Sequence, residues 1–227
     1  RSTGKTGIVL ATSGPGATNL VTGIATAYMD SIPLVAITGN VSCGLLGLDS
    51  FQEVDITGIT MPITKCNYLV RSVDELADVV REAFAIARSG RPGPVLIDIP
   101  KNVTAEKADY EPLPRSAHGT SGRLGKLMKR SSQNFKAPEP DHRDIDKLVE
   151  MIAASKKPLL ICGGGVVRAR AHHEFEALAN RIDSPVAITV MGAGGFRGRN
   201  PLTTGMIGMH GSQASNMAVD ACDLLIA

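Results

Sequence analysis

Hydrophobic and polar residues follow two patterns along this chain, short apolar runs and longer amphipathic stretches. Short continuous apolar runs are typical of strands buried in a parallel sheet. They predict strands over residues 8–11, 34–38, 95–99, 159–162, 186–190 and 224–227. The stretches between the runs have helical spacing, which predicts helices over residues 17–29, 73–88, 145–154, 174–182 and 213–221. This alternation predicts an α/β fold with right-handed crossovers.

The alternation stops between about residue 102 and residue 141, where prolines are frequent and periodicity is weak. From Arg115 to Lys136 this stretch carries six Lys or Arg residues and no acid. A basic arm for nucleic acid is one interpretation, and a solvated interdomain linker is the one we favour. We therefore predict two doubly wound parallel-sheet domains, residues 1–103 and 141–227, joined by a linker over residues 104–140.

The composition excludes several classes of protein. The chain has 227 residues, of which 43% are hydrophobic and 20% charged, with a net charge of +2, and these values are ordinary for a globular domain. Its four cysteines are far apart and form no C-x-x-C pair, which argues against a disulfide framework or a zinc site. No apolar run approaches about 20 residues, so we expect no membrane partner. We expect a cytoplasmic protein, or one of an organelle stroma or matrix if the source is eukaryotic.

A glycine-rich turn, residues 12–19, joins the first predicted strand to the first predicted helix. A strand that ends in such a turn aims free backbone N–H groups at one point, and glycines let a ligand approach closely. From spacing alone the turn is either a phosphate cradle or an ordinary connection of an α/β domain.

Four further segments follow this turn in order, at residues 30–39, 49–53, 89–95 and 98–101. Together with the turn they resemble the acetolactate synthase large-subunit family of thiamine-diphosphate-dependent enzymes. The resemblance implies that the first domain binds the aminopyrimidine of thiamine diphosphate and that the second is the first part of a Rossmann-like central domain. It also implies that a third domain, the Mg²⁺ ligands and a catalytic glutamate lie outside this chain, so no metal site is expected within it.

The resemblance gives roles to five residues of the first domain. Pro15 and Asn19 would line the pyrimidine, which moves the expected ligand of the glycine turn away from phosphate. Phe51 would contact the second 2-ketoacid, Gln52 would hydrogen-bond near the pyrimidine, and Lys101 would attract the carboxylate of pyruvate. The alternatives are structural: Pro15 shapes a turn, Asn19 satisfies backbone groups, and Lys101 is a solvated loop residue.

The resemblance also implies an FAD site. Arg91 lies on a rigid loop, where its guanidinium suits a phosphate or a ring carbonyl, although it could instead cap the preceding helix. Three segments of the second domain resemble the flavin-contacting segments of the family. Their residues are Gly163, Gly164 and Gly165, then Thr189, Val190 and Met191, then Met209, His210 and Gly211. His210 taken alone is an ordinary loop histidine.

The implied activity is decarboxylation of pyruvate and condensation of the two-carbon unit with pyruvate or 2-ketobutyrate, in branched-chain amino acid biosynthesis. FAD would be structural, and the assembly would be a homodimer or higher oligomer, with or without a small regulatory subunit. The chain opens on Arg1 and ends within a predicted strand, so we expect a piece of a longer enzyme, inactive alone. Two alternatives remain: another carboligase or decarboxylase such as glyoxylate carboligase, and a non-catalytic nucleotide-binding module. Asn40 and Cys66 depart from the Gln and His usual in the family.

Overall fold

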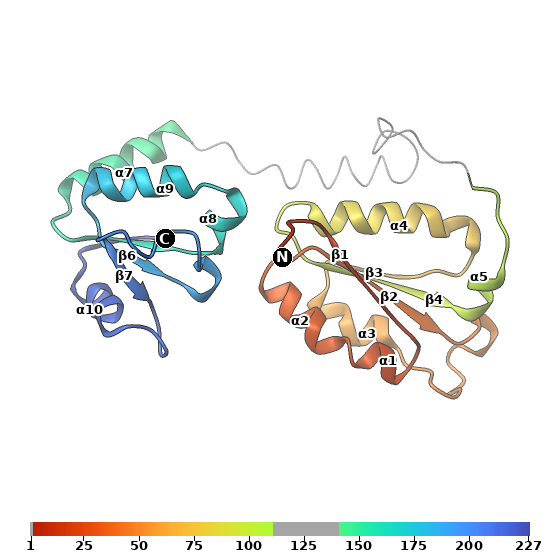
Figure 1. Cartoon of the computed structure of the whole chain (residues 1–227). Helices are drawn as coiled ribbons and strands as arrows, with labels where there is room; N and C mark the ends of the chain where they lie inside the picture. Colours follow the sequence, from red (N-terminus) through yellow and green to blue (C-terminus); the bar gives the residue numbers. More distant parts are fainter. Residues whose placement is uncertain (1, 111–140) are drawn as a thin grey trace. The chain divides into compact units, whose positions relative to one another are not determined.

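The computed structural model describes residues 2–110 and 141–227. The chain divides into two compact units, Arg1–Ala137 and Pro138–Ala227. Each unit carries its own parallel sheet, with helices on both faces (Figure 1). The predicted fold class is therefore confirmed. Most of the predicted linker, with its basic run, lies outside the described residues.

The sheet of the first unit has the strand order β1-β2-β4-β3. All its pairings are parallel, and the register sets Thr38 opposite Asp98. Three of the strands were predicted within two residues at each end. The fourth, β3, was missed because its sequence mixes polar and apolar residues. The bounds are β1 (Gly7–Ala11), β2 (Leu34–Asn40), β3 (Cys66–Leu69) and β4 (Pro94–Pro100).

One long helix covers one face of this sheet and three short helices cover the other (Figure 1). The long helix, α4, has the bounds that were predicted, because a capping box between Ser72 and Glu75 fixes its start. The predicted helix over residues 17–29 is instead two helices, since the chain turns at Asn19 and Leu20. The bounds are α1 (Pro15–Thr18), α2 (Val21–Met29), α3 (Ile56–Thr60) and α4 (Val73–Arg88), with α5 (Lys101–Ala105) directly after β4.

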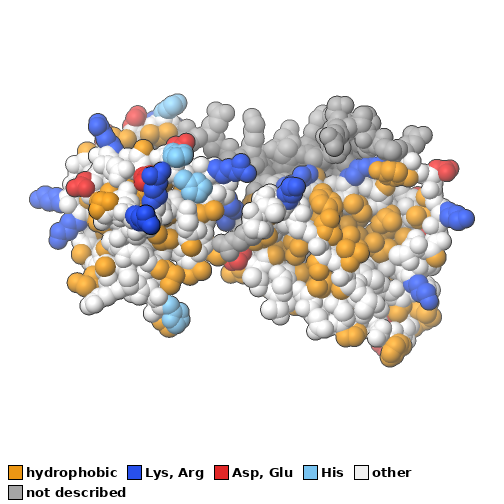
Figure 2. Space-filling view, in the orientation of Figure 1, with side chains coloured by type: hydrophobic (Ala, Val, Ile, Leu, Met, Phe, Trp, Pro, Cys, Tyr) orange, Lys and Arg blue, Asp and Glu red, His pale blue; other side chains and the backbone are white. Residues whose placement is uncertain are grey.

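Alternate residues of each strand pack into different layers, as the pleat requires. Val35, Val95 and Ile97 face α4, whereas Ala36 and Leu96 face the short helices. On β1, Val9 packs with the short helices, and its neighbours Ile8 and Leu10 are 56% and 71% exposed. The face of the first unit shown in Figure 2 accordingly carries a patch of hydrophobic side chains.

The second unit has the strand order β7-β6-β5-β8, again all parallel. In Figure 1, α7 and α9 lie on one face of this sheet and α10 lies on the other. Its core joins Leu160, Cys162 and Val186 to Ala179 and Phe196. The bounds are β5 (Pro158–Cys162), β6 (Val186–Ile188), β7 (Thr203–Met206) and β8 (Leu224–Ile226), with α7 (His142–Ala154), α8 (Gly164–Ala169), α9 (His172–Ile182) and α10 (Gln213–Ala221).

The predicted strand over residues 186–190 is too long. It ends at Ile188, because Thr189 caps a 3₁₀ helix, η4 (Val190–Gly192), by accepting a hydrogen bond from Gly192 N at 3.1 Å. The prediction that Val190 belongs to the strand is thus wrong. The turn keeps Val190 exposed at the end of β6.

Candidate functional site

The glycine turn at the end of β1 lies directly against the turn that carries Phe51 and Gln52. Gly14 has φ 57° and ψ −118°, a conformation essentially reserved for glycine. A Cβ atom built on Gly14 would lie 2.8 Å from the carbonyl oxygen of Gln52 and 2.9 Å from its Cβ. Two segments that are far apart in sequence therefore form one surface, and the turns depend on glycine to approach this closely.

Phe51 projects from a turn, residues 47–53, that we call the Phe51 turn. Its side chain is 89% exposed, and Gln52 and Asp49 both have positive φ, 61° and 53°. The carboxylate of Glu53 accepts hydrogen bonds from Gly47 N and from Ser50 N, the latter at 2.9 Å. These bonds from backbone N–H groups, with a further one from Leu48, lower the pKa of Glu53. Glu53 closes the turn, and the sequence analysis missed it.

Pro15 and Asn19 extend the same surface. Pro15 is the exposed first residue of α1, and Asn19 is the exposed residue that ends it, one helical turn later. Asn19 N donates to Pro15 O at 3.1 Å, a backbone hydrogen bond that any residue could make here, so the role of the Asn19 side chain stays a prediction. Lys101 is the exposed first residue of α5, at the carboxyl end of β4. It lies at the same edge of the sheet, where ligands of α/β proteins bind.

Asp98 is a buried carboxyl on β4, and it was not predicted as a site residue. It is 1% exposed, and it accepts hydrogen bonds from Thr38 Oγ1 at 2.7 Å and from Asn40 Nδ2 at 2.5 Å. Burial raises its pKa, the two hydrogen bonds oppose that shift, and Asp55 adds to it. A single acid inside the apolar run at 95–99 was the signal for such a group, since buried carboxyls need partners.

The end of β2 is held by two further hydrogen bonds. Asn40 Oδ1 accepts from Val41 N at 2.8 Å, and Asn102 Oδ1 accepts from Cys43 N at 2.8 Å. The amide of Asn40 thus joins Asp98 on β4 to the segment that leads into the Phe51 turn. Asn40, which stands where the family usually has glutamine, is therefore one of the residues that hold this segment.

Arg91 caps a helix, but not the preceding one. Its Nη2 donates to Tyr28 O at 3.2 Å and Met29 O at 3.1 Å, at the C-terminus of α2. Its Nε donates to Ser31 Oγ at 2.8 Å. A guanidinium at a helix C-terminus complements the helix dipole. Capping of α4 by Arg91 was therefore the wrong alternative, and its role toward FAD stays a prediction.

The three glycine-rich segments of the second unit meet at one edge of its sheet. They follow β5, β6 and β7, which are neighbours in the sheet. Thr189 N donates to Cys162 O at 3.0 Å, and Ile207 N donates to Ile188 O at 3.0 Å. A Cβ on Gly164 would lie 3.1 Å from the Cβ of Met191, whereas Gly163 and Gly165 have nothing within 4 Å of that position. The predicted groups of residues are thus adjacent, with open space above two of the glycines.

The third of these segments forms a turn, residues 205–212, that we call the Met209 turn, and it projects from the end of β7 (Figure 1). Met209 is 92% exposed, His210 is also exposed, and a Cβ on Gly211 would lie 2.3 Å from Met206 O. The side chain of Asn216 on α10 makes two hydrogen bonds to Gly208, accepting from its N at 3.0 Å and donating to its O at 3.0 Å. No sequence signal pointed to Asn216.

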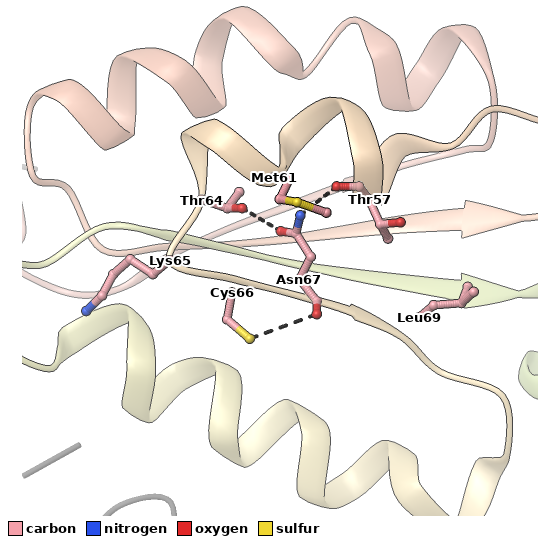
Figure 3. Close-up of a pocket in the computed structure, with 7 residues that line it drawn as sticks. All are labelled: Thr57, Met61, Thr64, Lys65, Cys66, Asn67 and Leu69. Atoms are coloured by element: carbon pink, nitrogen blue, oxygen red, sulfur yellow. Dashed lines mark hydrogen bonds between the residues drawn. The ribbon is translucent and has the colours of Figure 1, made fainter. Parts of the chain in front are cut away.

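A cavity of about 400 Å³ lies elsewhere, between β3 and α3 (Figure 3). Its polar groups already have partners, since Asn67 accepts from Thr64 Oγ1 at 2.6 Å and donates to Thr57 O at 2.7 Å. Lys65 donates to Ile86 O and Ser89 O at the end of α4. None of the predicted site residues lines this cavity.

The described residues hold neither a metal-binding cluster nor a helix suited to a membrane. No group of three or more His, Cys, Asp or Glu within residues 2–110 and 141–227 is arranged to hold a metal ion. In the same residues no helix has the length and apolar character needed to cross a membrane.

Comparison with protein-family models matches both units. Residues 1–59 match the thiamine pyrophosphate enzyme N-terminal TPP binding domain, and residues 145–227 match the thiamine pyrophosphate enzyme central domain. This chain belongs to the thiamine pyrophosphate enzyme family. The glycine turn and the Phe51 turn lie in the part of the chain that matches the TPP binding domain. The Met209 turn lies in the part that matches the central domain.

Curated relatives match the entire chain. It is 50% identical over 227 residues to the acetolactate synthase large subunit of Cyanidium caldarium and 50% identical over 231 residues to the acetolactate synthase of Arthrospira platensis. It is 45% identical over 228 residues to a probable acetolactate synthase large subunit of Methanocaldococcus jannaschii. Each alignment covers 100% of this chain but only 37–38% of the relative.

Proposed function

We propose that the protein containing this chain is an acetolactate synthase. It would decarboxylate pyruvate on thiamine diphosphate and join the two-carbon unit to pyruvate or 2-ketobutyrate. The identity of 45–50% along the whole chain to proteins of that name supports the proposal. The observation that carries it is the contact between Gly14 and Gln52, because it joins the segment expected at the cofactor to the segment expected at the second substrate.

The residues at this contact fit the pyrimidine of the cofactor. Pro15 and Phe51 offer exposed apolar surface, and Asn19 and Gln52 offer exposed amides, which suits a flat ring with a polar edge. When bound, thiamine diphosphate supplies the electron sink for decarboxylation and carbon–carbon bond formation. Phe51 would pack on the acceptor 2-ketoacid, and Lys101 would attract its carboxylate.

The edge of the second sheet fits FAD. Gly163 and Gly165 leave open space at the end of β5, where a nucleotide can approach the backbone. Met209 offers a large apolar surface on a turn fixed by Asn216. FAD would be a structural group here, and the Mg²⁺ ligands would lie beyond this chain. The words "large subunit" in the names of relatives support assembly into an oligomer with a small subunit.

The test is an assay of the protein encoded by the complete reading frame, with thiamine diphosphate, Mg²⁺ and FAD added. We expect acetolactate from pyruvate and the corresponding acetohydroxy acid when 2-ketobutyrate is added. Product from glyoxylate but none from pyruvate would favour glyoxylate carboligase. FAD binding without any carboligation would favour a non-catalytic nucleotide-binding module, and either result would overturn the proposal.

A further inference from the structure

Glu53 is the side chain that closes the Phe51 turn. Its two carboxylate oxygens accept from the start and from the middle of the turn, one from Gly47 N and the other from Ser50 N at 2.9 Å. Charge-assisted hydrogen bonds of this kind are stronger than neutral ones. A single residue thus satisfies two backbone donors that the turn would otherwise leave to water.

Besides Glu53, the turn has two backbone hydrogen bonds, from Glu53 N to Ser50 O at 2.9 Å and from Leu48 N to Leu45 O at 3.3 Å, and few side-chain contacts. Its apolar side chains, Leu48 and Phe51, are 65% and 89% exposed, so no core packing of their own anchors them. Asp49 and Gln52 have positive φ without being glycine, and such residues persist only where the surroundings hold them. The one other side-chain tie within the turn's described contacts is the bond from Ser50 Oγ to Leu45 O at 3.1 Å.

The residue after Glu53 is anchored in the core. Val54 packs against the cluster that contains Ala17 and Ile56. The carboxylate of Glu53 therefore connects a fixed point of the chain to an exposed, strained turn. At the same end of that turn, the backbone of Gln52, the residue directly before Glu53, meets Gly14.

We propose that Glu53 is a positioning residue that sets Phe51 and Gln52 against the glycine turn and thereby controls how the acceptor 2-ketoacid is bound. The inference rests on the proposed function for the identity of the acceptor, but not for the closure of the turn. Glu53 itself touches no substrate. It acts through the placement of Phe51.

The test compares Glu53→Gln with Glu75→Gln in the complete protein. Glu75 is the matched control, because it also accepts two backbone hydrogen bonds, from Arg71 N at 2.6 Å and Ser72 N at 3.3 Å, in the capping box of α4. In Glu75 one oxygen, Oε1, accepts both bonds, so the amide oxygen of Glu75→Gln can keep them and this variant should lower the melting temperature less than Glu53→Gln does. Only Glu53→Gln should change the turn, since a neutral amide presents one acceptor oxygen and one NH₂ donor where two acceptors are needed.

Three readouts separate positioning from general damage. With both acceptors present, the ratio of the two products should shift several-fold in Glu53→Gln and stay within about twofold in Glu75→Gln. The KM for the acceptor should rise about tenfold while kcat falls less. Amide exchange at Gly47 and Ser50 should accelerate at least about tenfold in Glu53→Gln only. Glu53→Asp, which keeps the charge but shortens the reach, should give intermediate values and serves if Glu53→Gln does not fold.

An unchanged product ratio together with an unchanged acceptor KM would overturn the inference, as would unchanged exchange at Gly47 and Ser50. If the wild-type protein forms no acetolactate, the proposed function fails by itself. The exchange measurement then still decides whether Glu53 closes the turn, because it needs no substrate.

Discussion

The Phe51 turn and the Met209 turn present the same kind of feature by different physical means. Each carries a highly exposed apolar side chain at its tip, Phe51 at 89% in the first and Met209 at 92% in the second. In the Met209 turn the positive φ values fall on Gly205 and Gly208, where they cost little. In the Phe51 turn two of the positive φ values fall on Asp49 and Gln52, so this turn stores strain.

The side chains that hold the two turns differ in charge. Asn216 bonds both backbone groups of Gly208 with a neutral amide, whereas Glu53 holds its turn with a charged carboxylate. The Met209 turn is therefore determined mainly by glycines, and the Phe51 turn depends on one ionised group and on its neighbour, the glycine turn. The comparison predicts that the Phe51 turn is the more easily disturbed of the two.

The largest effect should come from Gly14→Ala, which removes the contact between the glycine turn and the Phe51 turn. The new Cβ would meet backbone at 2.8 Å, and ψ of −118° at φ 57° does not suit alanine. We expect the free energy of unfolding of the first unit to fall by about 3 kcal/mol. Exchange of the β2 core amides in the complete protein measures this change.

Gly16→Ala is the control, two residues away. Its Cβ would clash with the methyl group of Thr12, at 2.7 Å, and that side chain can move, while its other neighbours lie at ordinary contact distance. This variant should lose about 1 kcal/mol or less. Equal losses in the two variants would show that the contact with Gln52 is not what makes Gly14 necessary.

The next effect concerns Asp98 and its two hydrogen-bond partners at the end of β2. Asp98→Ala removes the acceptor of Thr38 and Asn40 and leaves one buried and one half-buried donor without a partner. Each such donor costs about 1–3 kcal/mol, but the variant also relieves the burial of a carboxyl, so we expect a net loss of about 2 kcal/mol. Exchange of the amides at the end of β2, including Val41 and Cys43, should show it.

The raised pKa of Asp98 determines how the loss of stability in Asp98→Ala changes with pH. A carboxyl whose pKa is raised by folding destabilises the folded state as pH rises from its ordinary pKa, about 3.9, through the folded value. Asp98→Ala should therefore cost more at low pH than at neutral pH. A loss that grows toward neutral pH would contradict this account of Asp98.

Much of this architecture was predictable from the sequence, and the reason is visible in particular residues. The strands β2, β4 and β5 lie in short apolar runs of the sequence. The capping-box residues Ser72 and Glu75 indicate where α4 begins. The predicted site segments also lie at the carboxyl ends of their strands, because parallel sheets place them there. The strand β3 was not predictable, since two of its residues, Asn67 and Tyr68, are polar.

The residues whose side chains hold the turns and the end of β2 could not be predicted from the sequence pattern. Glu53, Asp98 and Asn216 each act on backbone or side-chain groups that only folding brings near, across 6, 60 and 8 residues of sequence in the bonds to Gly47, Thr38 and Gly208. The glycine spacing showed where turns lie. It could not show which side chain closes each of them, because that depends on tertiary distance.

A smaller effect should follow from Asn216→Ala in the Met209 turn. The variant loses two hydrogen bonds to Gly208 in an exposed place, so we expect a loss of about 1 kcal/mol. Because Gly205 and Gly208 retain their conformations without strain, the turn should loosen rather than collapse. Equilibrium titration with FAD should show weaker binding, by about tenfold or less.

Gln213→Ala is the control on the same helix, since Gln213 is exposed in the first turn of α10. It should leave both FAD affinity and exchange at Gly208 unchanged. The comparison would be reversed if the loss of FAD-binding free energy in Asn216→Ala exceeded the loss of unfolding free energy in Gly14→Ala. The Met209 turn would then be the more fragile of the two.

The smallest effect, and the most specific, is a difference in the response of the two turns to acid. Hydrogen bonds from backbone N–H groups lower the pKa of Glu53. A carboxyl with a lowered pKa stabilises the folded turn above the ordinary glutamate pKa of about 4.3, and this contribution is lost as pH falls through the lower, folded value. Exchange protection at Gly47 and Ser50, corrected for the intrinsic rate, should thus be flat from about pH 7 to about pH 5 and decline below about pH 4. Protection at Gly208 should not change, because the amide of Asn216 does not titrate.

In Glu53→Gln the step at Gly47 and Ser50 should disappear. A step that persists in that variant, or one of equal size at Gly208, would show that acid loosens the units as a whole and that the charge of Glu53 does not distinguish the two turns.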